Sequence, residues 1–165
     1  MPHPATLTIN QLLAECSAER TRRGGPGGQH RNKVETAVVL RHEPTGIRAD
    51  ASERRSQAAN HAQAVHRLRV RLALEVRTPS AAAPSPRWAA RVASRRLAIN
   101  SDHEDFPALL AEALDALAAR DWNVAAAAEF LCISATQLVK LLNIEPEALA
   151  QLNRKRQQSG LTALR

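Results

Sequence analysis

Residues 78–86 divide this chain into two parts. The segment Thr-Pro-Ser-Ala-Ala-Ala-Pro-Ser-Pro holds three prolines and no charged side chain. Proline has no backbone N–H and disfavours the helical conformation of the residue before it, so a helix cannot run through this segment. Proline-rich stretches of this kind form semi-extended spacers. We therefore predict a linker at 78–86, with one domain at 1–77 and a second at 87–165.

The two parts differ in charge. Residues 1–100 contain 17 Lys or Arg and 7 Asp or Glu, a net charge of +10, whereas residues 101–165 contain 6 and 9, a net charge of −3. A single arginine on a helix is often only solvated, but a cluster of this size favours contact with phosphate groups. We expect the first part to meet nucleic acid and residues 101–165 to meet a basic protein surface.

Glycine is concentrated at one place in the first part. Four of the six glycines fall within residues 24–28, in the segment GGPGGQHRNK of residues 24–33. The spacing matches neither a dinucleotide-binding loop nor a phosphate-binding loop that ends in Gly-Lys-Ser/Thr. A flexible linker is the simplest alternative, but basic residues flank the glycines on both sides and a strand pattern follows directly. We therefore interpret the segment as a functional loop rather than a flexible linker.

The rest of the first part predicts a small β-sheet beside helices. Apolar and polar residues alternate over 34–42, the letters EPTG at 43–46 are typical of a turn, and residues 47–50 can return as an antiparallel strand. Residues 8–20 predict a helix that starts with a capping box of Thr8 and Gln11. Residues 55–77 predict a long helix, with an apolar stripe of Ala58, Ala62, Val65, Leu68, Leu72 and Val76.

The second part predicts helices only. We expect a short basic helix at 87–100, an amphipathic helix around 106–117, and further helices at 124–131, 134–142 and 147–158. Residues 121–142 resemble a helix-turn-helix, and a plain helical hairpin is an equally good interpretation. Cys132 stands where such turns often have glycine, so this residue either bears strain or the turn differs. The predicted fold class is α+β: a small sheet with a glycine loop packed on a long helix, followed by an all-α, helix-turn-helix-like domain.

The stretch from Arg22 to about Leu72 resembles the catalytic domain of class I peptide chain release factors and their codon-independent relatives in ribosome rescue. The likeness rests on GPGGQHRNKVETAVVLRH at 25–42, PTGI at 44–47 and RSQ at 55–57, in the order and spacing of that family. A lone Gly-Gly-Gln would be weak support, whereas the three segments in register are specific. It implies hydrolysis of the peptidyl-tRNA ester on the ribosome.

The resemblance assigns catalysis to Gly27, Gly28 and Gln29. The two glycines can adopt positive φ and let the backbone approach the end of the tRNA, which aims the N–H of Gln29 at the charge of the tetrahedral intermediate. The amide side chain of Gln29 can position the attacking water. The ribosome would supply the remainder of the active site, so no metal and no cofactor are expected. The histidines lack metal-ligand spacing and are interpreted as packing or RNA-contacting residues.

The partners implied are the large-subunit rRNA and peptidyl-tRNA, with a ribosomal or helper protein for residues 101–165. The expected RNA contacts are Arg22, Arg23, His30, Arg31, Asn32, Lys33, Arg54, Arg55, Gln57, Arg67 and Arg71; Arg69 is on the same helix. Cys16 is expected to be a core thiol on the first helix. The two cysteines have no disulfide framework and no apolar run suits a signal or a membrane span, so we expect a cytoplasmic protein with no membrane partner.

The remaining expectations concern codon dependence, an alternative function and the effect of cleavage in the linker. Only residues 1–23 precede the segment GGPGGQHRNK, fewer than a codon-reading domain needs, so release is expected without a stop codon. The alternative function is a non-enzymatic, nucleic-acid-binding regulatory protein that uses the helix-turn-helix-like domain. We also expect cleavage within residues 79–86 to leave two soluble pieces.

Overall fold

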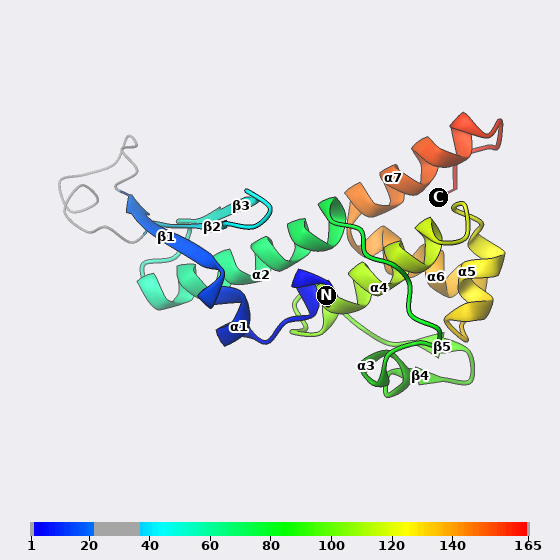
Figure 1. Ribbon diagram of the computed structural model, residues 1–165, viewed down its shortest axis with the longest axis horizontal. Coiled ribbons are helices and arrows are strands. Elements are labelled where there is room, and N and C mark those ends of the chain that lie inside the picture. The colour runs from blue at the N-terminus through cyan, green and yellow to red at the C-terminus, as the bar shows by residue number, and fades with distance from the viewer. Residues whose placement is uncertain (1, 22–36, 165) are drawn as a thin grey trace. The chain divides into compact units, whose positions relative to one another are not determined.

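The computed structural model describes residues 2–21 and 37–164 (Figure 1). They form two compact units, Pro4–Leu72 and a second made of Met1–His3 with Ala73–Arg165. The predicted α+β fold class is confirmed by a small sheet with several helices. The two units divide after Leu72, inside the longest helix, whereas the boundary predicted from the prolines lies a few residues later; that domain division stays a prediction.

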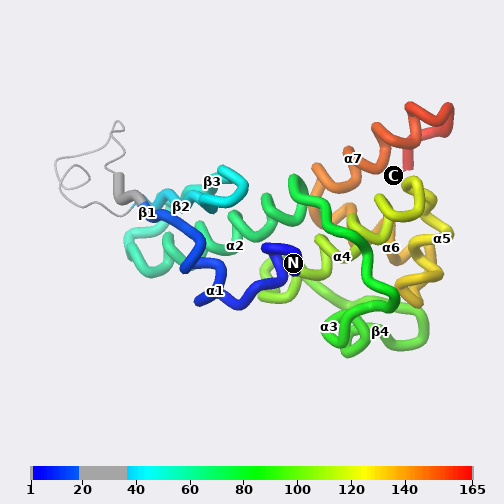
Figure 2. The backbone as a smooth tube through the Cα atoms, in the orientation of Figure 1, coloured from blue at the N-terminus to red at the C-terminus, as the bar shows by residue number. Residues whose placement is uncertain are grey.

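The first unit is a three-stranded sheet with helices beside it. Its elements are η1 (Pro4–Thr6), α1 (Ile9–Ala14), β1 (Cys16–Thr21), β2 (Ala37–His42), β3 (Arg48–Ala51) and α2 (Gln57–Glu75), of which the last continues past the unit. The strands are antiparallel in the order β1-β2-β3. Figures 1 and 2 both show α2 running alongside this sheet. The predicted return strand and long helix are confirmed.

Alternation along β2 and β3 gives the sheet a buried face. Val38 pairs with Ala51 and Leu40 with Ala49, and all four are buried. The next residues in sequence face the other side, where Arg41 is exposed. The period of two predicted for residues 37–42 is therefore confirmed, because successive side chains of a strand point to opposite faces.

The predicted helix at 8–20 is wrong beyond Ala14. The capping box is present: Gln11 N–H is bonded to the Thr8 hydroxyl, while the Gln11 side chain accepts from the Thr8 backbone. The helix nevertheless ends at Ala14 and residues 16–21 form β1, which pairs with β2 over its whole length. Pairing in the sheet outweighs the modest helix propensity of Cys, Ser and Thr. Cys16 is thus a half-buried strand residue rather than a core thiol of α1.

The buried face of α2 also differs from the predicted stripe at its start. Ala58 and Ala62 are exposed, whereas Asn60 is fully buried. The Asn60 side chain accepts from Arg54 N and donates to Arg54 O, both at 2.9 Å. A polar side chain whose groups are both bonded can be buried at little cost. Further along, the predicted Val65, Leu68 and Leu72 are buried, as are Ala64 and Ala73.

The second unit is built around a helix that is buried on almost every side. Its elements are α3 (Pro86–Ala89), β4 (Val92–Ala93), β5 (Arg96–Leu97), α4 (Phe106–Ala118), α5 (Val124–Phe130), α6 (Ala135–Ile144) and α7 (Pro146–Gln158). Buried residues occupy α4 from Phe106 to Leu117, except Glu112. The four helices predicted from residue 106 onward are confirmed, with ends shifted by a few residues.

The helix predicted at 87–100 is wrong after Ala89. The chain turns instead into a two-stranded hairpin whose turn residues, Ser94 and Arg95, have φ values of 47° and 61°. Within α3, the buried ring of Trp88 donates from Nε1 to Leu131 O at 2.8 Å. Arg95 O in turn accepts from Ser134 N at 3.2 Å. These bonds join segments that are far apart in the chain, so the helical periodicity of residues 87–100 could not reveal them.

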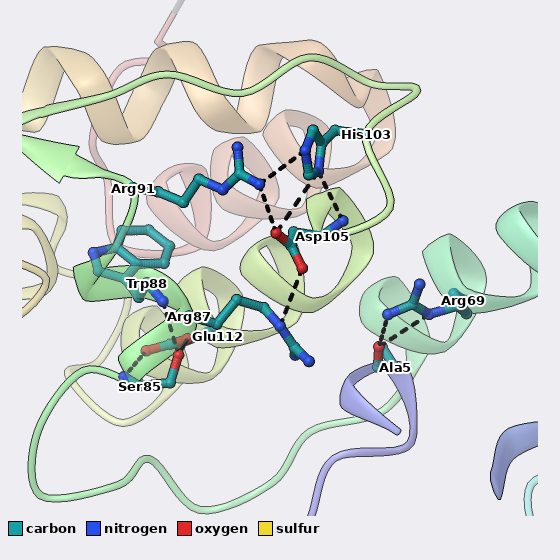
Figure 3. A network of polar contacts seen from close by, with 9 residues as sticks. All are labelled: Ala5, Arg69, Ser85, Arg87, Trp88, Arg91, His103, Asp105 and Glu112. Atoms are coloured by element: carbon teal, nitrogen blue, oxygen red, sulfur yellow. Dashed lines mark hydrogen bonds and ion pairs between the residues drawn. The ribbon is translucent and has the colours of Figure 1, made fainter. Parts of the chain in front are cut away.

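Residues 76–85 contain no helix or strand, but both ends of the predicted linker are fixed to α4. Thr78 donates its N–H and its hydroxyl to the carboxylate of Asp115, at 3.1 and 2.5 Å. Ser85 does the same to Glu112, at 2.7 and 2.6 Å, as Figure 3 shows. Asp115 and Glu112 are three residues apart and so share one face of α4. The proline segment is therefore held against α4 of the second unit at both of its ends.

Helices α5 and α6 form the expected bent pair. Their axes differ by 96°, within the range of helix-turn-helix motifs. Cys132 has φ 56°, and Ile133 N–H is bonded to Ala128 O at 3.0 Å, the geometry of a helix C-cap that normally carries glycine. Of the two alternatives predicted for Cys132, the left-handed backbone is the one observed, and the turn is not a different one. In the described part of the chain no single helix is long and apolar enough to cross a membrane, and this bent pair alone meets the length and composition test.

Candidate functional site: the strand pair that carries the glycine loop

The β1–β2 pair fixes where the glycine segment begins and ends. Pairing runs from Cys16 with His42 to Thr21 with Ala37, so the residues that flank segment 22–36 are direct partners across the sheet. The predicted catalytic residues Gly27, Gly28 and Gln29 lie in that segment, outside the described residues. So do the predicted RNA contacts, which are Arg22, Arg23, His30, Arg31, Asn32 and Lys33. The structure describes the two paired strands, β1 and β2, that precede and follow this segment.

The opposite end of the strand pair is held by His42. Its ring is almost completely buried and lies 2.8 Å from Thr45 Oγ1 through Nδ1 and 2.9 Å from Glu15 Oε2 through Nε2. Glu43 N–H also donates to Glu15 O at 2.9 Å. These bonds join the end of α1, the end of β2 and the turn before β3. The sequence does not reveal this contact because Glu15 lies 27 residues from His42 in the chain, and His42 is a packing residue.

The half-buried Cys16 beside this bracket is a poor nucleophile. Burial raises the pKa of the Cys16 thiol, and the carboxylates of Glu15 and Glu43 raise it further. A higher pKa leaves less thiolate, the reactive form, at any given pH.

Among the described RNA-contact candidates, Arg54 and Arg55 are exposed and Gln57 is half-buried. Arg54 is held at its backbone by Asn60, so its side chain starts from a fixed position just before α2. Fixed backbone with an exposed guanidinium suits a phosphate contact, because less freedom is lost on binding. The structure thus leaves these three positions available for the predicted role, which stays a prediction.

Arg67 and Arg71 instead reach the edge of the sheet. Arg67 Nη1 donates to Asp50 O at 2.8 Å and to Glu53 Oε1 at 2.7 Å, and Arg71 Nη1 donates to Arg48 O. The hydrogen bond from Arg67 lowers the pKa of Glu53. β3 is an edge strand, so alternate carbonyls face away from β2. Residues four apart on a helix and two apart on a strand are both about 6 Å apart, so the two arginines match two successive edge carbonyls.

Arg69, on the same helix, points inward. Its side chain is buried and donates to Ala5 O from Nε and Nη2, at 3.3 and 3.1 Å (Figure 3). The arginines from residue 54 to residue 71 therefore have three roles: Arg69 is a buried brace, Arg67 and Arg71 cover the sheet edge, and Arg54 and Arg55 are exposed charges. Their spacing in the sequence does not distinguish these roles, because the first two roles depend on backbone carbonyls of other elements.

Comparison with known proteins assigns the family. The RF-1 domain model matches residues 6–103, more than half of the chain, so this protein belongs to the RF-1 domain family, to which class I peptide chain release factors belong. The predicted resemblance is confirmed. The match includes the strand pair, the glycine segment between its strands and α2.

Curated relatives share the same part of the chain. Peptide chain release factor 1 of Caldicellulosiruptor saccharolyticus is 52% identical over 72 residues, 44% of this chain and 20% of the relative. Peptide chain release factor PrfB1, chloroplastic, of Arabidopsis thaliana is 54% identical over 52 residues, 32% of this chain and 11% of the relative. Peptide chain release factor 2 of Paramagnetospirillum magneticum is 43% identical over 67 residues, 41% and 18% respectively. The chain thus spans a fifth or less of the length of these relatives.

Proposed function

We propose that this protein hydrolyses the ester bond of peptidyl-tRNA on the ribosome, with Gly27, Gly28 and Gln29 as the catalytic loop. The observation that carries the proposal is the Gly-Gly-Gln segment inside the family match, joined at both ends to paired strand positions, Thr21 and Ala37. A rigid support of this kind suits a loop that must bring a backbone N–H to a reacting carbonyl. Large-subunit rRNA and peptidyl-tRNA are the proposed partners, in the cytoplasm.

The decisive variant is Gly28→Ala. If the loop needs positive φ at this glycine, a Cβ excludes the active backbone without removing a phosphate contact. We expect peptide release from P-site peptidyl-tRNA to fall by about a hundredfold or more, the usual cost of losing an oxyanion donor, while ribosome binding changes little. Gln29→Ala should behave in the same way. Wild-type turnover by Gly28→Ala would refute the catalytic assignment.

Gly46→Ala is the matched control. Gly46 has φ 71°, and no other atom lies within 4 Å of the position that a Cβ would occupy. An alanine at this position would therefore meet left-handed strain and no steric clash, in a turn outside residues 22–36. We expect it to lower stability by about 1 kcal/mol and to leave the release rate per folded molecule unchanged.

We further propose that release does not depend on the codon in the A site. The proposal is supported by the resemblance of residues 22–72 to the codon-independent relatives of this family, and the match to the curated relative covers 20% of its length. The measurement is the release rate on ribosomes with stop, sense or no A-site codon. Equal rates support codon independence, and a strict stop-codon requirement rejects it while leaving the hydrolysis proposal intact.

The second candidate function is nucleic-acid binding through α5 and α6. It is favoured by the 96° bend and the C-cap at Cys132, with Thr136, Lys140 and Asn143 exposed on α6. Binding of duplex DNA by the full chain, lost in Lys140→Glu and unaffected by Gly28→Ala, would support it. Absence of duplex binding at low salt would reject it, because electrostatic attraction is strongest there.

A further inference from the structure

The second unit contains a groove that the proposed ester hydrolysis does not use. It has a volume of about 680 Å³ and lies among the starts of α5 and α6, the end of α7 and the chain that follows α7. Its apolar lining includes Val124, Val139 and Leu164, with the ring of Trp122 beside them. The volume falls within the range of ligand and peptide sites.

One wall of the groove is the C-terminal segment folded back on α7. Gly160, with φ 73°, reverses the chain after the helix. Asn153 then holds both backbone groups of Leu164, accepting from its N–H at 2.7 Å and donating to its carbonyl at 2.9 Å. Arg156 Nε donates to Thr162 O at 2.9 Å. The wall is thus built by specific hydrogen bonds.

Two features of the lining favour a macromolecular partner. Leu161 is 52% exposed and, with Ile9, is one of the two large apolar side chains that are exposed in the described part of the chain. Trp122 has φ 60° and follows Asp121 with φ 51°. Left-handed backbone is costly for a bulky residue and persists where another requirement holds it in place. Trp122 is half-buried and belongs to the groove lining, where an apolar side chain can pack on its ring.

The charges around the groove select the partner. Lys155 and Arg156 contribute two positive charges to the lining and Asp121 one negative charge. Arg154 is paired with Glu147 at 2.6 Å, whereas Lys155 has no ion-pair partner among residues 2–21 and 37–164. The groove is therefore positive although residues 101–165 are net negative. This local charge reverses the expectation of a basic partner, because the nearest charges dominate at short range.

We propose that this groove docks an acidic peptide segment of a partner protein. An apolar side chain of that segment packs between Trp122 and Leu161, and its carboxylates lie beside Lys155 and Arg156. The aliphatic lining argues against RNA, whose binding surfaces are polar and strongly basic. Helix-in-groove recognition, in which an amphipathic helix presents apolar anchors, is the corresponding general mode.

The test uses the full chain and synthetic peptides of roughly twelve residues with Leu at helical spacing and Glu between. The protein has two tryptophans, so the indole N–H signals in an NMR titration report the site directly. We expect the acidic peptide to shift the signal of Trp122 and to leave that of the buried Trp88 in place. Versions with Ser for Leu, or with Lys for Glu, should each weaken binding about tenfold or more.

Matched variants separate the groove from general charge. Lys155→Glu should weaken binding of the acidic peptide about tenfold, whereas Lys140→Glu, the same change at an exposed position outside the lining, should alter it less than about threefold. Trp122→Gly relieves the left-handed strain and keeps the turn. We expect this variant to keep a melting temperature close to that of the wild type and to bind the acidic peptide about tenfold more weakly.

Three outcomes would overturn the proposal. They are failure of the acidic peptide to shift Trp122, wild-type affinity in Trp122→Gly, and tighter binding of a single-stranded RNA at the same residues. The NMR titration with the acidic peptide does not measure the hydrolysis of peptidyl-tRNA. A failure here therefore leaves ester hydrolysis by the glycine loop untouched, and loss of release in a loop variant leaves peptide docking untouched.

Discussion

Cys132 holds a backbone conformation that few side chains accept. Its φ of 56° places it at the position after α5 where glycine is usual, and the buried Ile133 follows it. The Cys132 side chain is exposed, so it contributes little packing that would offset the strain. Left-handed non-glycine residues persist in folded proteins when neighbouring contacts determine the turn.

We predict that Cys132→Gly stabilises the protein by about 0.5–1 kcal/mol, the left-handed penalty less the backbone entropy of glycine. The measurement is the midpoint of urea unfolding at equal slope. Cys132→Ala is the control, because it removes the thiol and keeps the Cβ that causes the strain. A gain as large in the alanine variant would assign the effect to the thiol instead.

At this scale the sequence was informative where a residue's role is local. The left-handed Cys132 and the capping box of Thr8 with Gln11 follow from a few neighbouring residues. The burial of Asn60 and Arg69 does not, because each depends on a backbone group of another segment, Arg54 and Ala5 respectively. The Gly-Gly-Gln assignment rests on motif and family, and its geometry lies outside the described residues.

At the scale of elements, α2 covers the edge of β3 with two arginines. Arg67 and Arg71 satisfy the carbonyls of Asp50 and Arg48. An arginine used in this way loses freedom to contact RNA, because its planar group is already engaged by a fixed acceptor. The sequence predicted both residues as RNA contacts, and the two roles can be separated by experiment.

We predict that replacing Arg67 and Arg71 together by Met lowers stability by about 1–3 kcal/mol, since two carbonyls lose their partners while the apolar stems remain. Hydrogen exchange of the β2–β3 amides should accelerate, because the edge strand opens more often. Arg55→Met is the control at an exposed position of the same segment. It should leave stability unchanged and reduce salt-dependent ribosome binding. The edge-cover role is wrong if the double variant is as stable as the control.

The elements themselves were predictable where one period dominates. The alternation of β2 and the apolar stripe in the later part of α2 are each set by burial on one face. Residues 16–20 and 87–100 were predicted as helices because helix patterns precede or surround them. Strand pairing with β2 and the Trp88 bond to Leu131 decide those segments, and neither is visible within a local window.

At the scale of the whole chain, the proline segment is bonded at both ends to α4. Thr78 and Ser85 are bonded to Asp115 and Glu112, and Gln151 Nε2 donates to Leu74 O at 3.0 Å. Residues 73–78 therefore belong with the helices that follow the prolines. The prolines correctly predicted a break in helical structure, but their composition could not reveal what the segment packs against.

This packing changes the result expected from cleavage within residues 79–84. We predict that the nicked chain elutes as one species, because the bonds of Thr78 to Asp115 and of Leu74 to Gln151 remain. Asp115→Ala removes the first contact and should let the two fragments separate at lower denaturant concentration. The measurement is gel filtration after site-specific proteolysis. Immediate separation of the wild-type fragments would restore the two-piece prediction.

The assignment of residues 2–3 to the second unit has a consequence for engineering. His3 is buried and its Nε2 lies 3.2 Å from Val76 O, so the chain leaves and re-enters this unit at neighbouring points. The chain thus leaves the second unit before residue 4 and returns to it after residue 72 at one place. A segment with this connectivity can be exchanged as a whole. The corresponding segment of another member of the family could replace residues 4–72, and the helical unit would keep its groove and its own core.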